Sequence, residues 1–134
     1  RVPIKSLVVG NFEISGTVVK VFKGKFLFES EGEKSMVISC IIDDGTGSVR
    51  CVFFRELAEE VCGIRAKDLE KLSEEERFER IKERIQGKQL IVSGKVKKNV
   101  NFDTLEMIAG SVKPLNPLDE SKKIVSLLEL KIGE

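Results

Sequence analysis

The run Ser48–Phe54 (SVRCVFF) carries the side chains best suited to holding a planar, charged ligand. Side chains alternate between the two faces of a β-strand, and one face here would be wholly apolar and therefore core: Val49, Cys51 and Phe53. Ser48 and Val52 would share the other face with Arg50 and Phe54. An exposed phenylalanine stacks on a nucleic-acid base for about 1–3 kcal/mol, and a guanidinium pairs with phosphate or stacks on a ring. Alternatively, Phe54 packs under the helical segment that follows.

A second candidate for ring stacking is Phe102, which lies between Asn101 and Asp103 in a predicted turn. A large apolar residue at a loop tip is typical of a contact site. Trp and Tyr are absent, so any aromatic stacking must come from the eight phenylalanines. The alternative is that Phe102 tucks against the mouth of the fold.

Lysines gather beside two predicted loops: Lys20, Lys23 and Lys25 follow the first strand, and Lys95, Lys97 and Lys98 end the fourth. Two such clusters would line the path of a phosphate backbone. For any single lysine, an equally good interpretation is that the side chain is simply exposed to solvent and has no ligand. Glu106 would accept hydrogen bonds from base amines, or pair with Lys95 or Arg50 across strands.

Nothing in the sequence indicates catalysis, a metal site, a cofactor or a small-molecule substrate. There is no histidine, and the three cysteines have no metal-ligand spacing. We interpret Cys40, Cys51 and Cys62 as reduced thiols, with Cys40 and Cys51 in apolar strand runs. The pair Asp43-Asp44 precedes Gly45 and is typical of a turn.

These side chains must be positioned by strands with a period of two. The first predicted strand, Phe12–Phe22, has Gly16 as a bend. A hairpin follows, with strands Met36–Ile42 and Ser48–Phe54, and a short extended piece at Lys25–Phe28 precedes it. The remaining predicted elements are a helical insertion at Arg55–Gly87 with a capping box at Ser73–Glu76, strands Gln89–Lys98 and Thr104–Val112, and a C-terminal helix capped by Asp119 with Ile124, Leu127 and Leu128 on one face.

Three strands, a helical insertion and two strands predict an all-β, five-stranded OB-fold barrel. We divide the chain into a lead-in (1–11), the OB-fold domain (12–117, with the insertion at 55–87) and a C-terminal helix or linker (118–134). The 134 residues suffice for one domain. The net charge of +1 argues against a uniformly basic binder but permits a local basic groove. No membrane span or signal sequence is visible, so we expect a cytoplasmic protein, nucleoid-associated if prokaryotic.

The strings ISGTVVKVF, IIDDGTGSVRCVFF and KKNVNFDTLEMIAGSV resemble the DNA-binding OB domains of replication protein A, above all the archaeal forms. The resemblance covers roughly Phe12–Pro117 and implies single-stranded DNA binding in replication, repair and recombination. It implies stacking positions at Phe54 and Phe102. It further implies that Arg50 and Glu106 match an arginine of strand three and a glutamate of the last strand. The helical insertion is long for the human-type domains.

Two functions remain open on the sequence. The first is single-stranded DNA binding by base stacking and phosphate contacts. RNA binding is a less favoured alternative of the same kind. The second is an OB-fold used for protein–protein assembly with other OB domains or subunits, with weak or no nucleic-acid binding. The C-terminal helix would serve that second role.

Overall fold

The computed structural model describes residues 1–101 and 103–115 of the chain. Its strands are β1 (Gly10–Val21), β2 (Leu27–Ser30), β3 (Glu33–Asp43), β4 (Ser48–Phe54), β5 (Gln89–Asn99) and β6 (Thr104–Pro114). Its helices are the short η1 (Ile4–Ser6), α1 (Glu56–Cys62), α2 (Ala66–Leu69) and α3 (Glu74–Ile85). Phe102 and the expected C-terminal helix lie outside the described residues.

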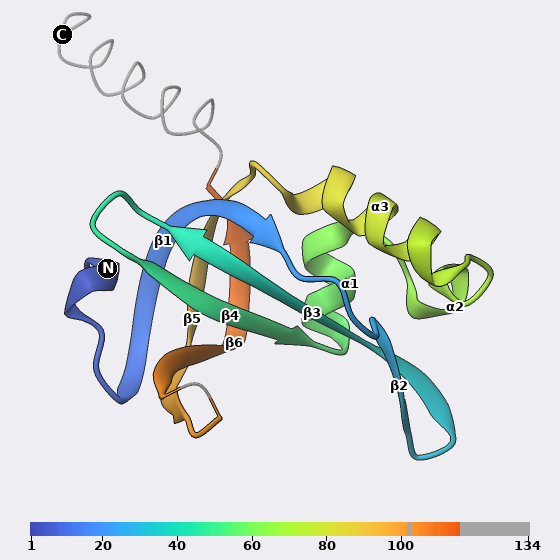
Figure 1. Cartoon of the computed structure of the whole chain (residues 1–134), viewed down its shortest axis with the longest axis horizontal. Coiled ribbons are helices and arrows are strands. Elements are labelled where there is room, and N and C mark those ends of the chain that lie inside the picture. Colours follow the sequence, from blue (N-terminus) through green and yellow to red (C-terminus); the bar gives the residue numbers. More distant parts are fainter. Residues whose placement is uncertain (102, 116–134) are drawn as a thin grey trace, which may run out of the picture.

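Five strands close into a barrel, as predicted for an OB-fold. The sheet runs β1-β5-β6-β4-β3, and β1 also pairs with β3, which closes the ring. All pairs are antiparallel except β4 with β6, which is parallel. The short extended piece expected at Lys25–Phe28 is instead β2, which begins at Leu27 and pairs with β3 outside the ring (Figure 1).

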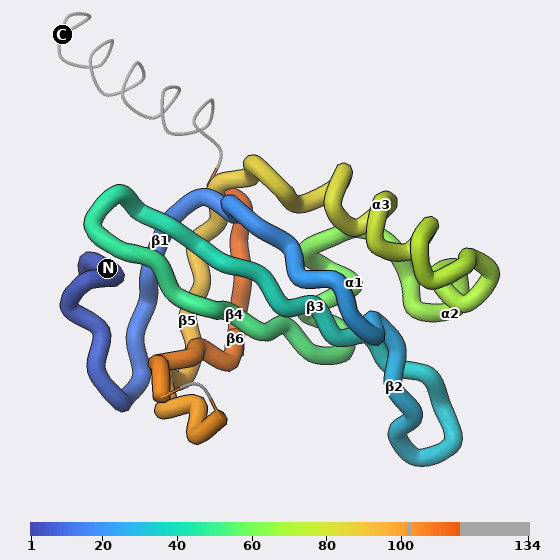
Figure 2. Tube along the Cα trace, in the orientation of Figure 1, coloured from blue at the N-terminus to red at the C-terminus, as the bar shows by residue number. Residues whose placement is uncertain are grey.

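Strand β1 bends because it serves two partners. Its residues from Gly10 to Thr17 pair with β5, and those from Thr17 to Val21 pair with β3. A Cβ on Gly16 would lie 2.7 Å from the carbonyl oxygen of Asp43, so only glycine allows this close backbone approach. A register shift follows between Val18 and Lys20. The expected bend is therefore confirmed, and β1 arches over the top of the barrel (Figure 2).

The barrel interior holds the apolar faces of the strands, including the fully buried Ile14, Val18 and Phe53. Cys40 and Cys51 face each other across β3 and β4 with no exposed surface. Burial raises the pKa of Cys40 to about 12 and raises that of Cys51 as well. Both thiols therefore stay protonated and pack as small apolar groups, as expected. Cys62 is buried too.

The predicted helical insertion is present and consists of three short helices, α1, α2 and α3. Gly63 ends α1 with φ +71°, a left-handed conformation suited to glycine. The capping box at Ser73 and Glu76 begins α3, as predicted. Ile81 and Ile85 of α3 are fully buried, so the insertion covers one end of the barrel beside β1.

The turn between β3 and β4 also anchors the lead-in. The Asp44 carboxylate accepts hydrogen bonds from the Thr46 hydroxyl (2.6 Å) and from the backbone N–H of Ile4 (2.8 Å). Slight burial opposes ionisation, but these hydrogen bonds and those from the Thr46 and Gly47 amides lower the pKa of Asp44 to about 2. The Asp44 carboxylate therefore stabilises the turn, and its hydrogen bond to Ile4 holds η1 against the barrel.

Candidate nucleic-acid interface

The outer surface of β3 and β4, on the opposite side from the core, brings together most of the candidate residues. We call it the β3–β4 face and define it by Phe22, Ile41, Arg50, Val52, Phe54 and Glu106. In the strand register Arg50 lies beside Ile41 of β3 and beside Glu106 of β6. Val52, expected to be exposed, is only 6% exposed although it lies outside the main core cluster. It is flanked on both sides, by Ser39 of β3 and Ile108 of β6.

Arg50 contacts both an aromatic ring and a carboxylate on this face. Its guanidinium carbon lies 4.4 Å from the centroid of the Phe22 ring, a cation–π geometry. Its Nε lies 3.9 Å from Oε2 of Glu106, and that oxygen also accepts a hydrogen bond of 2.8 Å from Asn99. Glu106 was expected to pair with Lys95 or Arg50, and in the structure it pairs with Arg50. An incoming phosphate would compete with this carboxylate for the guanidinium.

Phe54 presents an open ring at the far end of β4. Its side chain is 42% exposed. The Phe28 ring of β2 supports it edge-on, with centroids 6.3 Å apart and planes at 86°. Phe54 is therefore accessible rather than packed away beneath the insertion, and a pre-oriented ring is what base stacking requires.

Phe22 is a member of this face that the sequence did not reveal. In β1 the even-numbered Ile14 and Val18 are buried, so simple alternation would send Phe22 inward. The register shift between Val18 and Lys20 reverses the phase, so Val21 becomes buried and Phe22 lies outside. Lys20 shares this reversal, and its Nζ lies 5.0 Å from the Phe22 centroid. The one feature of the sequence that pointed to this interruption of the alternation was Gly16, which predicted a bend in the strand.

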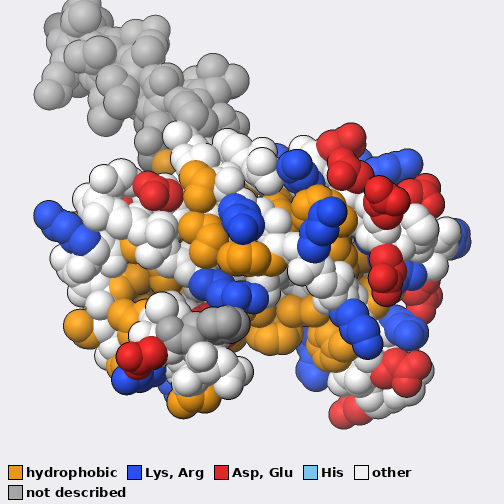
Figure 3. Space-filling view, viewed as in Figure 1, with side chains coloured by type: hydrophobic (Ala, Val, Ile, Leu, Met, Phe, Trp, Pro, Cys, Tyr) orange, Lys and Arg blue, Asp and Glu red, His pale blue; other side chains and the backbone are white. Residues whose placement is uncertain are grey.

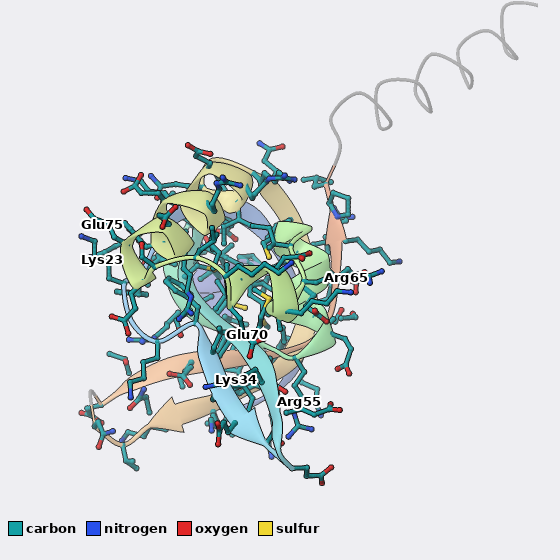
Figure 4. The ribbon with its side chains drawn as sticks, turned by 90° about the vertical axis from the view of Figure 1, so that its right-hand side faces the viewer. Lys23, Lys34, Arg55, Arg65, Glu70 and Glu75 are labelled. Atoms are coloured by element: carbon teal, nitrogen blue, oxygen red, sulfur yellow. The ribbon has the colours of Figure 1, made fainter. Side chains whose placement is uncertain are left out.

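The first lysine cluster is divided by the fold. Lys20 lies over Phe22, whereas Nζ of Lys23 lies 5.1 Å from the ring of Phe78 in α3. Lys23 and Lys25 line a hollow of about 440 Å³ together with Glu74 and Glu75, and Figure 4 shows Lys23 beside Glu75. Acidic neighbours reduce the pull of these two lysines on a phosphate.

The second cluster keeps the predicted alternation. Lys95 and Lys97 are exposed on either side of the fully buried Val96, and Lys97 lies opposite Glu106 in register. Lys98 forms an ion pair of 2.8 Å with Asp103 across the β5–β6 loop. Val100, another residue that the sequence did not single out, is 88% exposed at the tip of that loop.

Charge is distributed unevenly over the molecule despite the net value of +1. In Figure 3 hydrophobic side chains gather over β1, β3 and β4, with Lys and Arg side chains among them. Most Asp and Glu side chains visible in that view lie over the helical insertion and the tip of β2. The β3–β4 face is therefore largely apolar, and Lys20 and Lys97 lie beside its paired Arg50 and Glu106, which suits a ligand with rings and phosphates.

Two further findings bound the chemistry of the described residues. Within them no group of three or more His, Cys, Asp or Glu side chains is placed to hold a metal ion. No helix in the same part of the chain is long and apolar enough to span a membrane.

A closed five-stranded barrel with such a face defines the OB-fold class of domains. The model of the family described as "OB-fold nucleic acid binding domain" matches residues 12–115, and the chain belongs to this family. No curated protein sequence matches it significantly.

Solved structures agree with this assignment. A replication protein A domain from Methanococcus maripaludis is 22% identical, with a TM-score of 0.57 over 86% of this chain and 94% of that one. Yeast RPA bound to ssDNA is 11% identical, with a TM-score of 0.63 over 98% and 97%. A replication protein A heterotrimer bound to ssDNA is 17% identical, with a TM-score of 0.66 over 94% of this chain and 36% of that one. The resemblance to archaeal replication protein A is thus confirmed at the level of fold.

Proposed function

We propose that this domain binds single-stranded DNA along the β3–β4 face and does so without catalysis. The observation that carries the proposal is the Arg50 guanidinium 4.4 Å from the centroid of the Phe22 ring, on the same face as the exposed Phe54. A cation and accessible rings on one strand surface are what sequence-tolerant binding of single strands uses.

In the proposed complex one base stacks on Phe54, whose ring is already oriented by Phe28. A phosphate takes the place of Glu106 beside Arg50, and Lys20, Lys95 and Lys97 follow the backbone on either side. Phe102 remains a predicted second stacking position, and Lys98 is a predicted contact once released from Asp103. Lys23 and Lys25 contribute less because Glu74 and Glu75 lie beside them.

The proposed setting is the protection of single-stranded DNA during replication, repair and recombination, in the cytoplasm and on the nucleoid of a prokaryote. Other OB domains or subunits are the expected protein partners. Linked modules of modest individual affinity bind tightly through their effective concentration, which agrees with the low net charge of this domain.

Fluorescence anisotropy with a labelled oligo-dT tests the proposal. With about three to five phosphate contacts, the logarithm of the association constant should fall with the logarithm of salt at a slope of about −2 to −3.5. A slope near zero, or no binding at low salt, would refute it. Competition with an RNA oligomer of equal length separates DNA from RNA binding. Self-association without DNA binding would favour the assembly role instead.

A further inference from the structure

The lead-in forms one wall of a hollow beside Arg50. The hollow measures about 450 Å³ and opens between Ile4 and Leu7 of the lead-in and Phe22, Arg50 and Leu105 of the barrel. Its size falls in the range of about 300–1,000 Å³ that pockets for small ligands occupy. Because Phe22 and Arg50 belong to the β3–β4 face, the hollow continues that face toward the start of β4.

The wall from the lead-in is fixed in place. The N–H of Ile4 donates to Asp44 over 2.8 Å, and the N–H of Leu7 donates to the carbonyl of Ile4 over 3.1 Å. Ile4 and Leu7 are 5% and 8% exposed, whereas the next residue, Val8, is 60% exposed. The lead-in therefore turns two apolar side chains toward the barrel and leaves its neighbour in solvent.

The lining of the hollow selects the kind of occupant. Its described walls are largely aliphatic and include a single charged residue, Arg50, so a phosphate inside it would lose much of its hydration for one cationic contact. Phe22 and Arg50, which carry planar groups, and Ser48 and Thr104, which carry hydroxyls, are also lining residues. An uncharged heteroaromatic ring with polar edges fits this chemistry.

The position along β4 indicates where such a ring would come from. Ser48 and Phe54 are the two ends of β4, and six residue steps of a strand span about 20 Å. A single strand stacked on Phe54 and drawn along Arg50 therefore reaches the hollow within a few nucleotides. We propose that the hollow receives one unstacked base of the bound single strand, with Ile4 and Leu7 as its outer wall. This inference rests on the proposed function.

An abasic scan of the DNA tests the subsite. Single abasic residues are placed in turn along a labelled oligo-dT just long enough to bind, and affinity is measured for each. We expect a weakening of about fivefold or more at the position over Phe54 and again at the position in the hollow, the lower end of what a stacked base contributes.

Two variants of residues that line the hollow, with one matched control, test whether the second abasic position lies in the hollow. Leu7→Ala and Leu105→Ala remove the wall from opposite sides and should reduce the abasic effect there to less than twofold, while the position over Phe54 keeps its effect. Val8→Ala removes a similar side chain from the same segment but outside the hollow, so its profile should match the wild type. Thermal unfolding checks that each variant folds.

A measurement on the unaltered protein makes the result independent of variant stability. Oligo-dT carrying 4-thiothymidine at one position at a time is photocrosslinked and the attached peptides are mapped. Crosslinks from one end position to residues 4–7 or 104–105 support the subsite. Binding with crosslinks only elsewhere, or wall variants with wild-type abasic profiles, overturns it and leaves the proposed function standing. No binding of the wild type to oligo-dT overturns both.

Discussion

Replacing Phe54 with alanine should weaken DNA binding without changing its salt dependence. The ring is the open aromatic surface of the β3–β4 face, and one stacked base is worth about 1–3 kcal/mol, so the dissociation constant should rise about 5- to 150-fold. No charge is removed and no phosphate contact is lost, so the slope of log affinity against log salt should stay at its wild-type value.

The same variant should remain folded. Phe54 is 42% exposed, so truncation costs less than the about 3–5 kcal/mol typical of a fully buried phenylalanine. Phe54→Trp serves as the matched control, because it keeps an aromatic face and should retain binding. Val19→Ala, at an exposed position on β1, should bind as the wild type does.

The assay is fluorescence anisotropy at four or more salt concentrations, with thermal unfolding of each protein alongside. By contrast, Arg50→Gln should flatten the slope by about 0.7. Wild-type affinity in Phe54→Ala would refute the assignment of Phe54 as a stacking residue. Equal losses in Phe54→Ala and Phe54→Trp would show that local packing, rather than stacking, is being measured.

Three other outcomes follow from particular contacts. Glu106→Gln removes the negative charge beside the Arg50 guanidinium and should tighten binding to oligo-dT at low salt; weaker binding to oligo-dC than in the wild type would instead show that Glu106 accepts base amine hydrogens. Gly94→Ala should destabilise the barrel strongly, because a Cβ there would collide with the carbonyl oxygen of Ile108, whereas Gly110→Ala meets its nearest atom at 3.6 Å and should be mild by urea unfolding. The lowered pKa of Asp44, about 2 against an ordinary 3.8, means that its ionised form stabilises the fold above about pH 4 and that this contribution disappears as the pH falls toward 2. The stability difference between wild type and Asp44→Asn should therefore shrink between pH 4 and pH 2, and a constant difference would contradict this role.

Sequence patterns predicted the parts of the site that depend on neighbours along the chain. The alternation in Ser48–Phe54 placed Arg50 and Phe54 on the face away from Cys51 and Phe53, because adjacent side chains of a strand must point in opposite directions. The Asp-Gly turn and the Ser73 capping box were equally local and were confirmed. The same rule failed for Phe22, because the bulge in β1 interrupts the alternation.

The insertion and the lead-in were only partly predictable. Helical spacing located the helix that begins after Ser73, but the division into three short helices depends on the left-handed turn at Gly63 and on packing against the barrel. The lead-in contains no strong pattern of its own. Its burial of Ile4 and Leu7 depends on a hydrogen bond to Asp44, forty residues away along the chain.

By itself the sequence determined that the chain forms a five-stranded barrel with an aromatic and cationic strand, since strand period, turn residues and helix caps act over a few residues. Only the tertiary structure decided which distant side chains meet there. The parallel pairing of β4 with β6 sets Glu106 beside Arg50, and the closure of β1 onto β3 places Phe22 beneath the same guanidinium. Register between strands is fixed by long-range packing and by backbone shifts at bends, which leave no periodic trace in the sequence.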